Sequence, residues 1–230
     1  MSTTYAIPDL HGRRDLLDLA VDAIAQRTRG GVATVVLLGD YVNKGPASAQ
    51  VLDRLLTSFD QAWQLVFLKG NHDGIMFDAL RDAGALPQWL ENGGAATLRS
   101  YAPQSDHIPD PGIVPEGHRA FLERLRLIHI DAHRVYVHAG VDPARPLDAQ
   151  QESTLLTKRY AADDASGHGD RHVVHGHHPF RDGPKILHGH TDLDTLAWQT
   201  GRLVVGVFDD ERPGGPADLI KVIGPSYQDV

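Results

Sequence analysis

Acidic, amide and imidazole side chains gather in five short polar clusters along the chain. The clusters read PDLHG (8–12), GDYVNKG (39–45), GNHD (70–73), HAG (138–140) and GHHP (176–179). They contain six candidate metal ligands, Asp9, His11, Asp40, Asn71, His138 and His177. Oxygen and nitrogen donors of these kinds bind divalent cations, and a pair of such ions needs a bridging carboxylate with further ligands on either side. The set therefore predicts a dinuclear metal site.

The spacing within the clusters supports this interpretation. Asp9 and His11 are two residues apart, so both side chains can leave the same face of an extended segment. Asp40 follows an aliphatic run, and Gly39 gives the backbone room to turn at that point. Taken singly, Asp9 could cap a helix, and Asp40 or Asn71 could be a turn residue beside glycine. Five such clusters in one chain favour the metal site.

Each cluster comes where a predicted strand ends. The runs TTYAI (3–7), TVVLL (34–38), QLVFLK (64–69), RVYV (134–137) and RHVVH (171–175) are typical of buried strands, and 13–27 and 48–59 have helical spacing of their apolar residues. Alternation of strand and helix predicts parallel pairing in a layered α/β fold. Because strand ends converge on one crevice in such folds, we expect the five clusters to meet.

The rest of the chain predicts no second domain. Residues 76–127 form a mainly helical insertion in a single domain of residues 1–230, and RLVVGVFDD (202–210) and DLIKVIG (218–224) return to strand-like patterns. No run approaches the roughly 18 apolar residues that span a bilayer, so we expect a cytoplasmic protein without membrane contact.

The composition excludes several classes of function. The chain has no cysteine, which removes disulfides, thiolate zinc sites and a cysteine-based phosphatase mechanism. Its formal net charge of -8 argues against binding to nucleic acid or to an anionic membrane. Among its 230 residues are 14 histidines, an excess that matters because imidazole is a common metal ligand. Nitrogen and oxygen donors without sulfur suit manganese, iron, zinc or cobalt, and manganese is our first expectation.

The ordered clusters resemble the signature blocks of the phosphoprotein phosphatase type of calcineurin-like metallophosphoesterases. WLENGGAATLRSY (89–101) and VHAGVDPARPLDAQ (137–150) are similar to segments of bacterial serine/threonine phosphatases of that family, and the resemblance extends from Tyr5 to Asp209. It implies a four-layer αββα sandwich of two mixed β-sheets flanked by helices, with the metals at the C-terminal ends of the strands. It also implies that Asp9 and His11 hold one ion, that Asp40 bridges, and that Asn71, His138 and His177 hold the other.

The resemblance further implies roles for four residues around the metals. His72 would be the general acid, and Lys44 and Arg159 match the two positions where the family binds phosphate with arginine. Asn43 occupies the position where the family commonly has an aspartate paired with the histidine. A third departure is Lys69, where the family usually has arginine.

The function implied is hydrolysis of phosphomonoesters by a metal-activated water, as in phosphoserine and phosphothreonine phosphatases, with aryl phosphates also accepted. One alternative is a diadenosine tetraphosphate hydrolase, which shares the same metal blocks. Another is a metal-binding module with little turnover, suggested by Asn43, Lys44 and Lys69. The expected partner is a phosphorylated protein or a small phosphoester; the physiological substrate, the native metal and the oligomeric state stay open.

Overall fold

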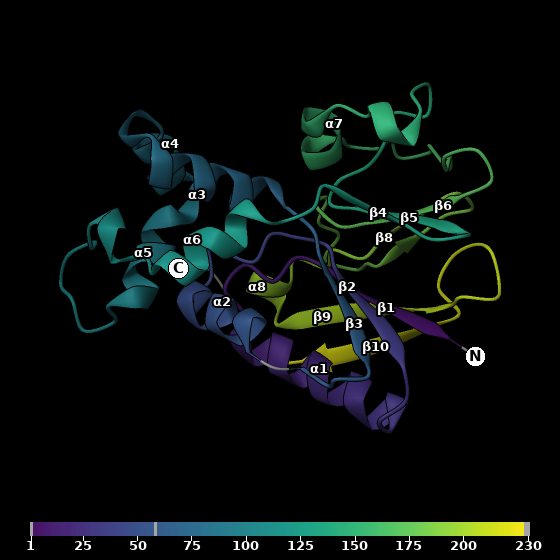
Figure 1. Cartoon of the computed structure of the whole chain (residues 1–230), viewed down its shortest axis with the longest axis horizontal. Coiled ribbons are helices and arrows are strands. Elements are labelled where there is room, and N and C mark those ends of the chain that lie inside the picture. Colours follow the sequence, from purple (N-terminus) through teal and green to yellow (C-terminus); the bar gives the residue numbers. More distant parts are fainter. Residues whose placement is uncertain (1, 58, 228–230) are drawn as a thin grey trace.

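Two five-stranded sheets packed face to face form the centre of the protein (Figure 1). The computed structural model describes residues 2–57 and 59–227. The first sheet has the order β10-β9-β1-β2-β3, with β1 at Thr3–Ile7, β2 at Ala33–Leu37, β3 at Trp63–Phe67, β9 at Arg202–Asp209 and β10 at Asp218–Ile223. The second has the order β4-β5-β6-β8-β7, with β4 at Ile128–Ile130, β5 at Arg134–Val137, β6 at His172–His175, β7 at Lys185–Ile186 and β8 at His190–Asp192.

Both sheets are mixed, which confirms the predicted fold class. Strands β1, β2 and β3 pair in parallel, as do β5, β6 and β8. The outer pairings, β9 with β1 and β10, β4 with β5, and β7 with β8, are antiparallel. The parallel strands at the centre of each sheet therefore direct their carboxyl ends to the same edge, where the polar clusters follow.

The strand residues alternate between two cores because successive side chains point to opposite faces. Val35 and Leu37 of β2 belong to the core beneath the helices, whereas Val36 lies in the core between the sheets. There it packs in one cluster with Tyr136 of β5 and Val174 of β6. The two sheets are thus held together by the faces that the helices do not cover.

Helices form the outer layers. They are α1 (Arg14–Thr28), α2 (Ser48–Leu56), α3 (Asn71–Arg81), α4 (Leu86–Trp89), α5 (Ala95–Tyr101), α6 (Glu116–Glu123), α7 (Glu152–Thr157) and α8 (Ala197–Thr200), with short turns at Ala83–Ala85, Leu90–Gly94, Pro111–Ile113 and Leu147–Ala149. Helices α1 and α2 lie on the first sheet, and α7 lies beside the second (Figure 1). Leu155 of α7 packs with Val135 and Val173, so it closes the fourth layer.

Residues between β3 and β4 are mainly helical, and this helical region begins at Asn71. Its buried side chains Met76, Trp89 and Phe121 belong to the same core cluster as the outer face of the first sheet. This region therefore shares the core of the sheet. Within the described part of the chain, no helix is long and apolar enough to cross a membrane.

Candidate dinuclear metal site

The six predicted metal ligands lie at the ends of parallel strands from both sheets. Asp9 and His11 follow β1, Asp40 follows β2, and Asn71 is the first residue of α3, directly after β3. From the second sheet, His138 follows β5 and His177 follows β6. All except Asn71 and His177 are buried, and these two are half-buried. Residues that are up to 168 positions apart in sequence thus meet at the edge where the two sheets face each other.

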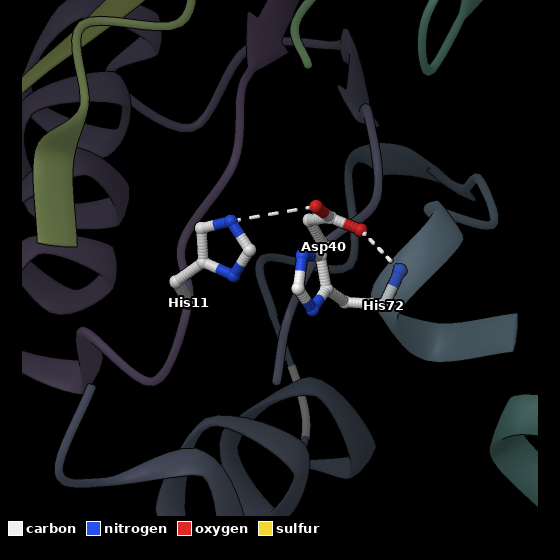
Figure 2. Close-up of side chains that lie close together, drawn as sticks. All are labelled: His11, Asp40 and His72. Carbon is white, nitrogen blue, oxygen red and sulfur yellow. Dashed lines mark hydrogen bonds and ion pairs between the residues drawn. The ribbon is translucent and has the colours of Figure 1, made fainter. Parts of the chain in front are cut away.

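Asp40 lies at the centre of this site. Its two carboxylate oxygens point to different histidines: Oδ2 is 3.4 Å from Nε2 of His11, and Oδ1 is 3.6 Å from Nε2 of His138. Asp40 is also common to two groups whose ligand atoms lie within 4.8 Å of one another, one with His11 and His72 and one with Asp9 and His138. Figure 2 shows the first group. This is the geometry that a carboxylate bridging two ions requires.

The ring nitrogens of the two flanking histidines are oriented by backbone carbonyls. Nδ1 of His11 donates to the carbonyl of Val42 at 2.9 Å, and Nδ1 of His138 donates to the carbonyl of Leu38 at 3.0 Å. Each bond fixes the ring so that the lone pair of Nε2 faces Asp40. Burial, together with the nearby Lys44, also holds the pKa of His11 well below its usual range, so the ring is in the neutral form that binds metals.

The side-chain amide of Asn71 lies close to two further predicted ligands, His138 and His177. Its Oδ1 lies 2.9 Å from Nε2 of His138 and 3.0 Å from Nδ1 of His177. The backbone N–H of His177 donates to Oδ1 of Asp9 at 3.2 Å, which joins the ends of β1 and β6. Asn71, His138 and His177 therefore converge on the side of Asp40 that faces away from His11.

The carboxylates of this site are buried without enough cations to balance them. Asp9 and Asp40 are each 2% exposed. Burial raises the pKa of Asp40 to about 7, and burial together with the neighbouring Asp194 raises the pKa of Asp9 well above its usual value. A buried carboxylate is stable when it is paired or coordinates a metal. The donor set and its charge deficit thus fit two divalent cations.

Sequence comparison agrees with this geometry. The profile of the calcineurin-like phosphoesterases matches residues 2–208. The chain belongs to the calcineurin-like phosphoesterase family. It is therefore a metallophosphoesterase, a hydrolase of the class that its motifs predict.

Comparison with curated relatives and solved structures shows which proteins this phosphoesterase resembles. It is 28% identical over 229 residues to a symmetrical bis(5'-nucleosyl)-tetraphosphatase of Nitrosospira multiformis. The matched region covers 97% of this chain and 74% of that protein. The protein of the same description from Pseudomonas putida is 30% identical over 70% of this chain, and the match covers only half of that protein. A solved structure described provisionally as a diadenosine tetraphosphatase has a TM-score of 0.69 at 25% identity, with 96% and 93% of the two chains covered. A serine/threonine phosphatase of Saccharomyces cerevisiae, with a TM-score of 0.63 at 15% identity over 100% of this chain and 82% of that chain, shares the fold.

The site also contains a buried carboxylate, Asp73, that the sequence analysis did not select. Asp73 is fully buried and accepts three backbone N–H bonds, from Asp40 at 2.8 Å, Gly70 at 2.9 Å and Tyr41 at 3.0 Å. It thereby ties the loop that carries Asp40 to the start of α3. The sequence contains a pattern that could have identified Asp73, because an acidic residue three positions after Gly70 is typical of a helix N-terminus.

Two glycines of the motifs are required by the ligand carboxylates. A Cβ at Gly70 would collide with Oδ1 of Asp40, and a Cβ at Gly176 would collide with Oδ1 of Asp9. The backbone of GNHD and of GHHP can approach the carboxylates only because these positions lack a side chain.

Strained backbone is concentrated at the site. The described residues include seven non-glycine residues with positive φ, and five belong to the predicted site: His11, Asp40, Asn43, Lys44 and His177. Such conformations cost of order 1–3 kcal/mol each and persist where the surrounding structure enforces them. The fold therefore holds these side chains at a cost in stability.

The structure brings Asn43 and His72 together. Nδ2 of Asn43 lies 2.9 Å from Nδ1 of His72. Oδ1 of the same amide accepts from Nε1 of Trp89 and from Oγ1 of Thr97, both at 2.9 Å. Because an indole N–H can only donate, these contacts fix the orientation of the amide. Asn43 thus donates to Nδ1 of His72, and the neutral ring carries its hydrogen on Nε2.

The three predicted cations have different positions. Nζ of Lys44 reaches into the site, 3.1 Å from Nε2 of His11. Arg159 is exposed and lies near His177, whose pKa is lowered to about 3 by burial and by the charges of His138 and Arg159. Lys69 does not join them, because its ammonium forms an ion pair with Glu152 at 2.8 Å. Of the three departures from the family pattern, Asn43 and Lys44 therefore face the site.

Proposed function

We propose that this phosphoesterase hydrolyses dinucleoside tetraphosphates, with diadenosine tetraphosphate as the substrate to test. The similarity of almost the whole chain to symmetrical bis(5'-nucleosyl)-tetraphosphatases carries the proposal. It favours the alternative of the sequence analysis over the phosphoprotein phosphatase that was our first expectation. The protein phosphatase neighbour supports the fold alone, because its sequence identity is 15%.

The ligand set would divide between two ions, with manganese as our first choice. Asp9 and His11 would bind one ion, and Asn71, His138 and His177 would bind the other. Asp40 would bind both ions. In this site the ions would polarise the phosphoryl oxygens and lower the pKa of a bound water toward neutrality. Buried histidines whose Nδ1 atoms are held by carbonyls would keep that arrangement in place.

The bond between Asn43 and His72 suits an anhydride better than an alkyl ester. Nδ1 of His72 already accepts from the amide, and burial lowers the pKa of His72 to about 3, so the ring stays neutral. An alkoxide needs a proton when it leaves. A nucleoside diphosphate leaves as a phosphate group whose second pKa is about 6, so it needs little help from an acid. His72 would then donate a hydrogen bond from Nε2 without giving up its proton.

Lys44 and Arg159 would hold the negative oxygens of the polyphosphate chain. Both side chains are exposed, and they approach the ligand cluster from the His11 side and the His177 side. A chain of four phosphates is long enough to contact cations on both sides of the metals. A monoester has only one phosphate, and it can use both cations only at the metal site itself.

The test is product analysis on protein reconstituted with manganese. We expect diadenosine tetraphosphate to yield ADP as the only nucleotide product, at a kcat/KM well above that for a phosphoserine peptide. A strong chelator should abolish the reaction, and manganese should restore it. Preference for the phosphopeptide, or no release of ADP from metal-loaded protein, would overturn the proposal.

A further inference from the structure

A cavity of about 480 Å³ opens beside the metal site. Its wall is built from five parts of the chain, namely the loop after β2, helices α2, α5 and α8, and the C-terminal segment, which contribute Lys44, Gln50, Arg99, Trp198 and Tyr227 among others. The volume lies in the range that small-molecule ligands occupy. Lys44 belongs both to this wall and to the site, where its Nζ is 3.1 Å from Nε2 of His11. The cavity and the metal site therefore share Lys44.

A buried arginine organises the aromatic part of the wall. Arg13 is fully buried, and its guanidinium binds the carboxylate of Asp15 at 2.9 and 2.8 Å. It also donates to the carbonyls of Trp198 at 3.2 Å and Pro225 at 2.8 Å and lies 4.8 Å from the ring centroid of Tyr227. Since Arg13 is two residues from His11, the segment that carries a metal ligand also anchors both aromatic residues.

The lining has the chemistry of a nucleoside site. Aromatic rings such as those of Trp198 and Tyr227 provide stacking surfaces for a base. Arg99 is exposed and, within residues 2–57 and 59–227, its side chain has no ion pair or hydrogen bond, so its charge is available to a ligand.

We propose that this cavity binds one nucleoside of the substrate, with the base against Trp198 and Tyr227 and the phosphate chain passing Lys44 to the metals. The proposal rests on the proposed function and gives it a specificity site. In this proposal, Trp198, Tyr227 and Arg99 recognise the nucleoside. A small aryl phosphate has no nucleoside. Changes in the cavity should therefore act on nucleotide substrates and leave the chemistry at the metals intact.

The first experiment compares steady-state kinetics on two substrates. Trp198→Ala should raise KM for diadenosine tetraphosphate about 5- to 150-fold, the fold-change that loss of a base–aromatic stack produces. It should leave kcat/KM for p-nitrophenyl phosphate within about twofold of wild type. Trp198→Phe should keep most of the affinity because it keeps a ring. Tyr227→Ala and Arg99→Ala provide independent variants. The control for Arg99→Ala is Arg124→Ala, a change of an exposed arginine at the C-terminal end of α6.

The second experiment measures binding without turnover. The protein has three tryptophans, of which Trp63 and Trp89 are buried in the core, so a ligand in the cavity reaches Trp198. In chelator, ADP should quench the fluorescence of wild-type protein and not that of Trp198→Phe, and inorganic pyrophosphate should quench neither. Equal quenching of both proteins by ADP, or none in wild type, would overturn the cavity as a nucleoside site.

The two proposals fail in different ways. If wild-type protein releases ADP from diadenosine tetraphosphate and none of the three cavity variants changes KM, the nucleoside site is wrong and the proposed function stands. If wild-type protein does not hydrolyse this substrate and ADP still quenches Trp198, the proposed function is wrong and the nucleoside site stands.

Discussion

The side chains proposed to bind metals and those proposed to bind substrate are held in opposite ways. His11 and His138 are buried, and a backbone carbonyl fixes the second nitrogen of each ring. Lys44 and Arg159 are exposed, and Arg159 has no hydrogen bond or ion pair within the described residues. The metal site therefore depends on the backbone at the strand ends. Substrate contacts depend on single side chains, which can differ between relatives without disturbing the metals.

The largest effect is expected for the carboxylate at the centre of the ligand shell. Asp40→Asn should lower turnover by more than about 100-fold, because loss of a ligand should exceed the 10- to 100-fold cost of changing its supporting residues. A neutral amide is a poor bridge between two cations. Metal analysis should show less than two bound ions per chain. Full occupancy with normal turnover would mean that Asp40 does not bridge.

Asp73 tests whether the backbone around the ligands matters as much as the ligands. Asp73→Asn places an amide where three backbone N–H groups need acceptors, so we expect a loss of about 1–3 kcal/mol in the free energy of unfolding. Metal affinity should fall by about 10- to 100-fold. Denaturant unfolding and metal titration measure the two effects. Asp78→Asn, an exposed change on the same helix, is the control and should alter neither.

A smaller effect, confined to substrate binding, is expected at the exposed rim. Arg159→Ala should raise KM for diadenosine tetraphosphate about tenfold, which corresponds to one lost charge-assisted hydrogen bond of about 1.4 kcal/mol. Metal content and thermal stability should stay at the wild-type level, since Arg159 supports neither. A fall in metal occupancy would show that the rim and the ligand shell are not independent.

The smallest effect should appear at Asn43, and only on esters. In Asn43→Asp, a carboxylate could accept from Nδ1 of His72 and favour the protonated ring. Turnover on a phosphoserine peptide should rise severalfold, and turnover on diadenosine tetraphosphate should stay nearly constant because its leaving group needs little acid catalysis. Adding His72→Asn to this variant should remove the gain. An equal change on both substrates would contradict the role proposed for the pair.

The sequence by itself was sufficient to predict the longer strands and to nominate candidate metal ligands. Short β-branched runs that end in PDLHG, GDYVNKG and GNHD predict parallel strands whose carboxyl ends meet, and β1, β2 and β3 pair in that way. The prediction works because strand periodicity and polar residues at strand ends are local patterns. The short strands β4, β7 and β8 were not predicted, since two or three residues carry too little periodicity to be recognised.

Only the tertiary structure decided how the site is supported and where a nucleoside could bind. Asp73 reads locally as a helix-start residue, and its contacts with the loop at Asp40 arise from the parallel pairing of β2 and β3. The cavity brings Lys44, Arg99 and Trp198 together from segments without a common motif. Its shape depends on how α8 and the C-terminal segment pack around the buried Arg13. Such long-range packing leaves no periodic pattern in the sequence, because each contact involves residues that are distant along the chain.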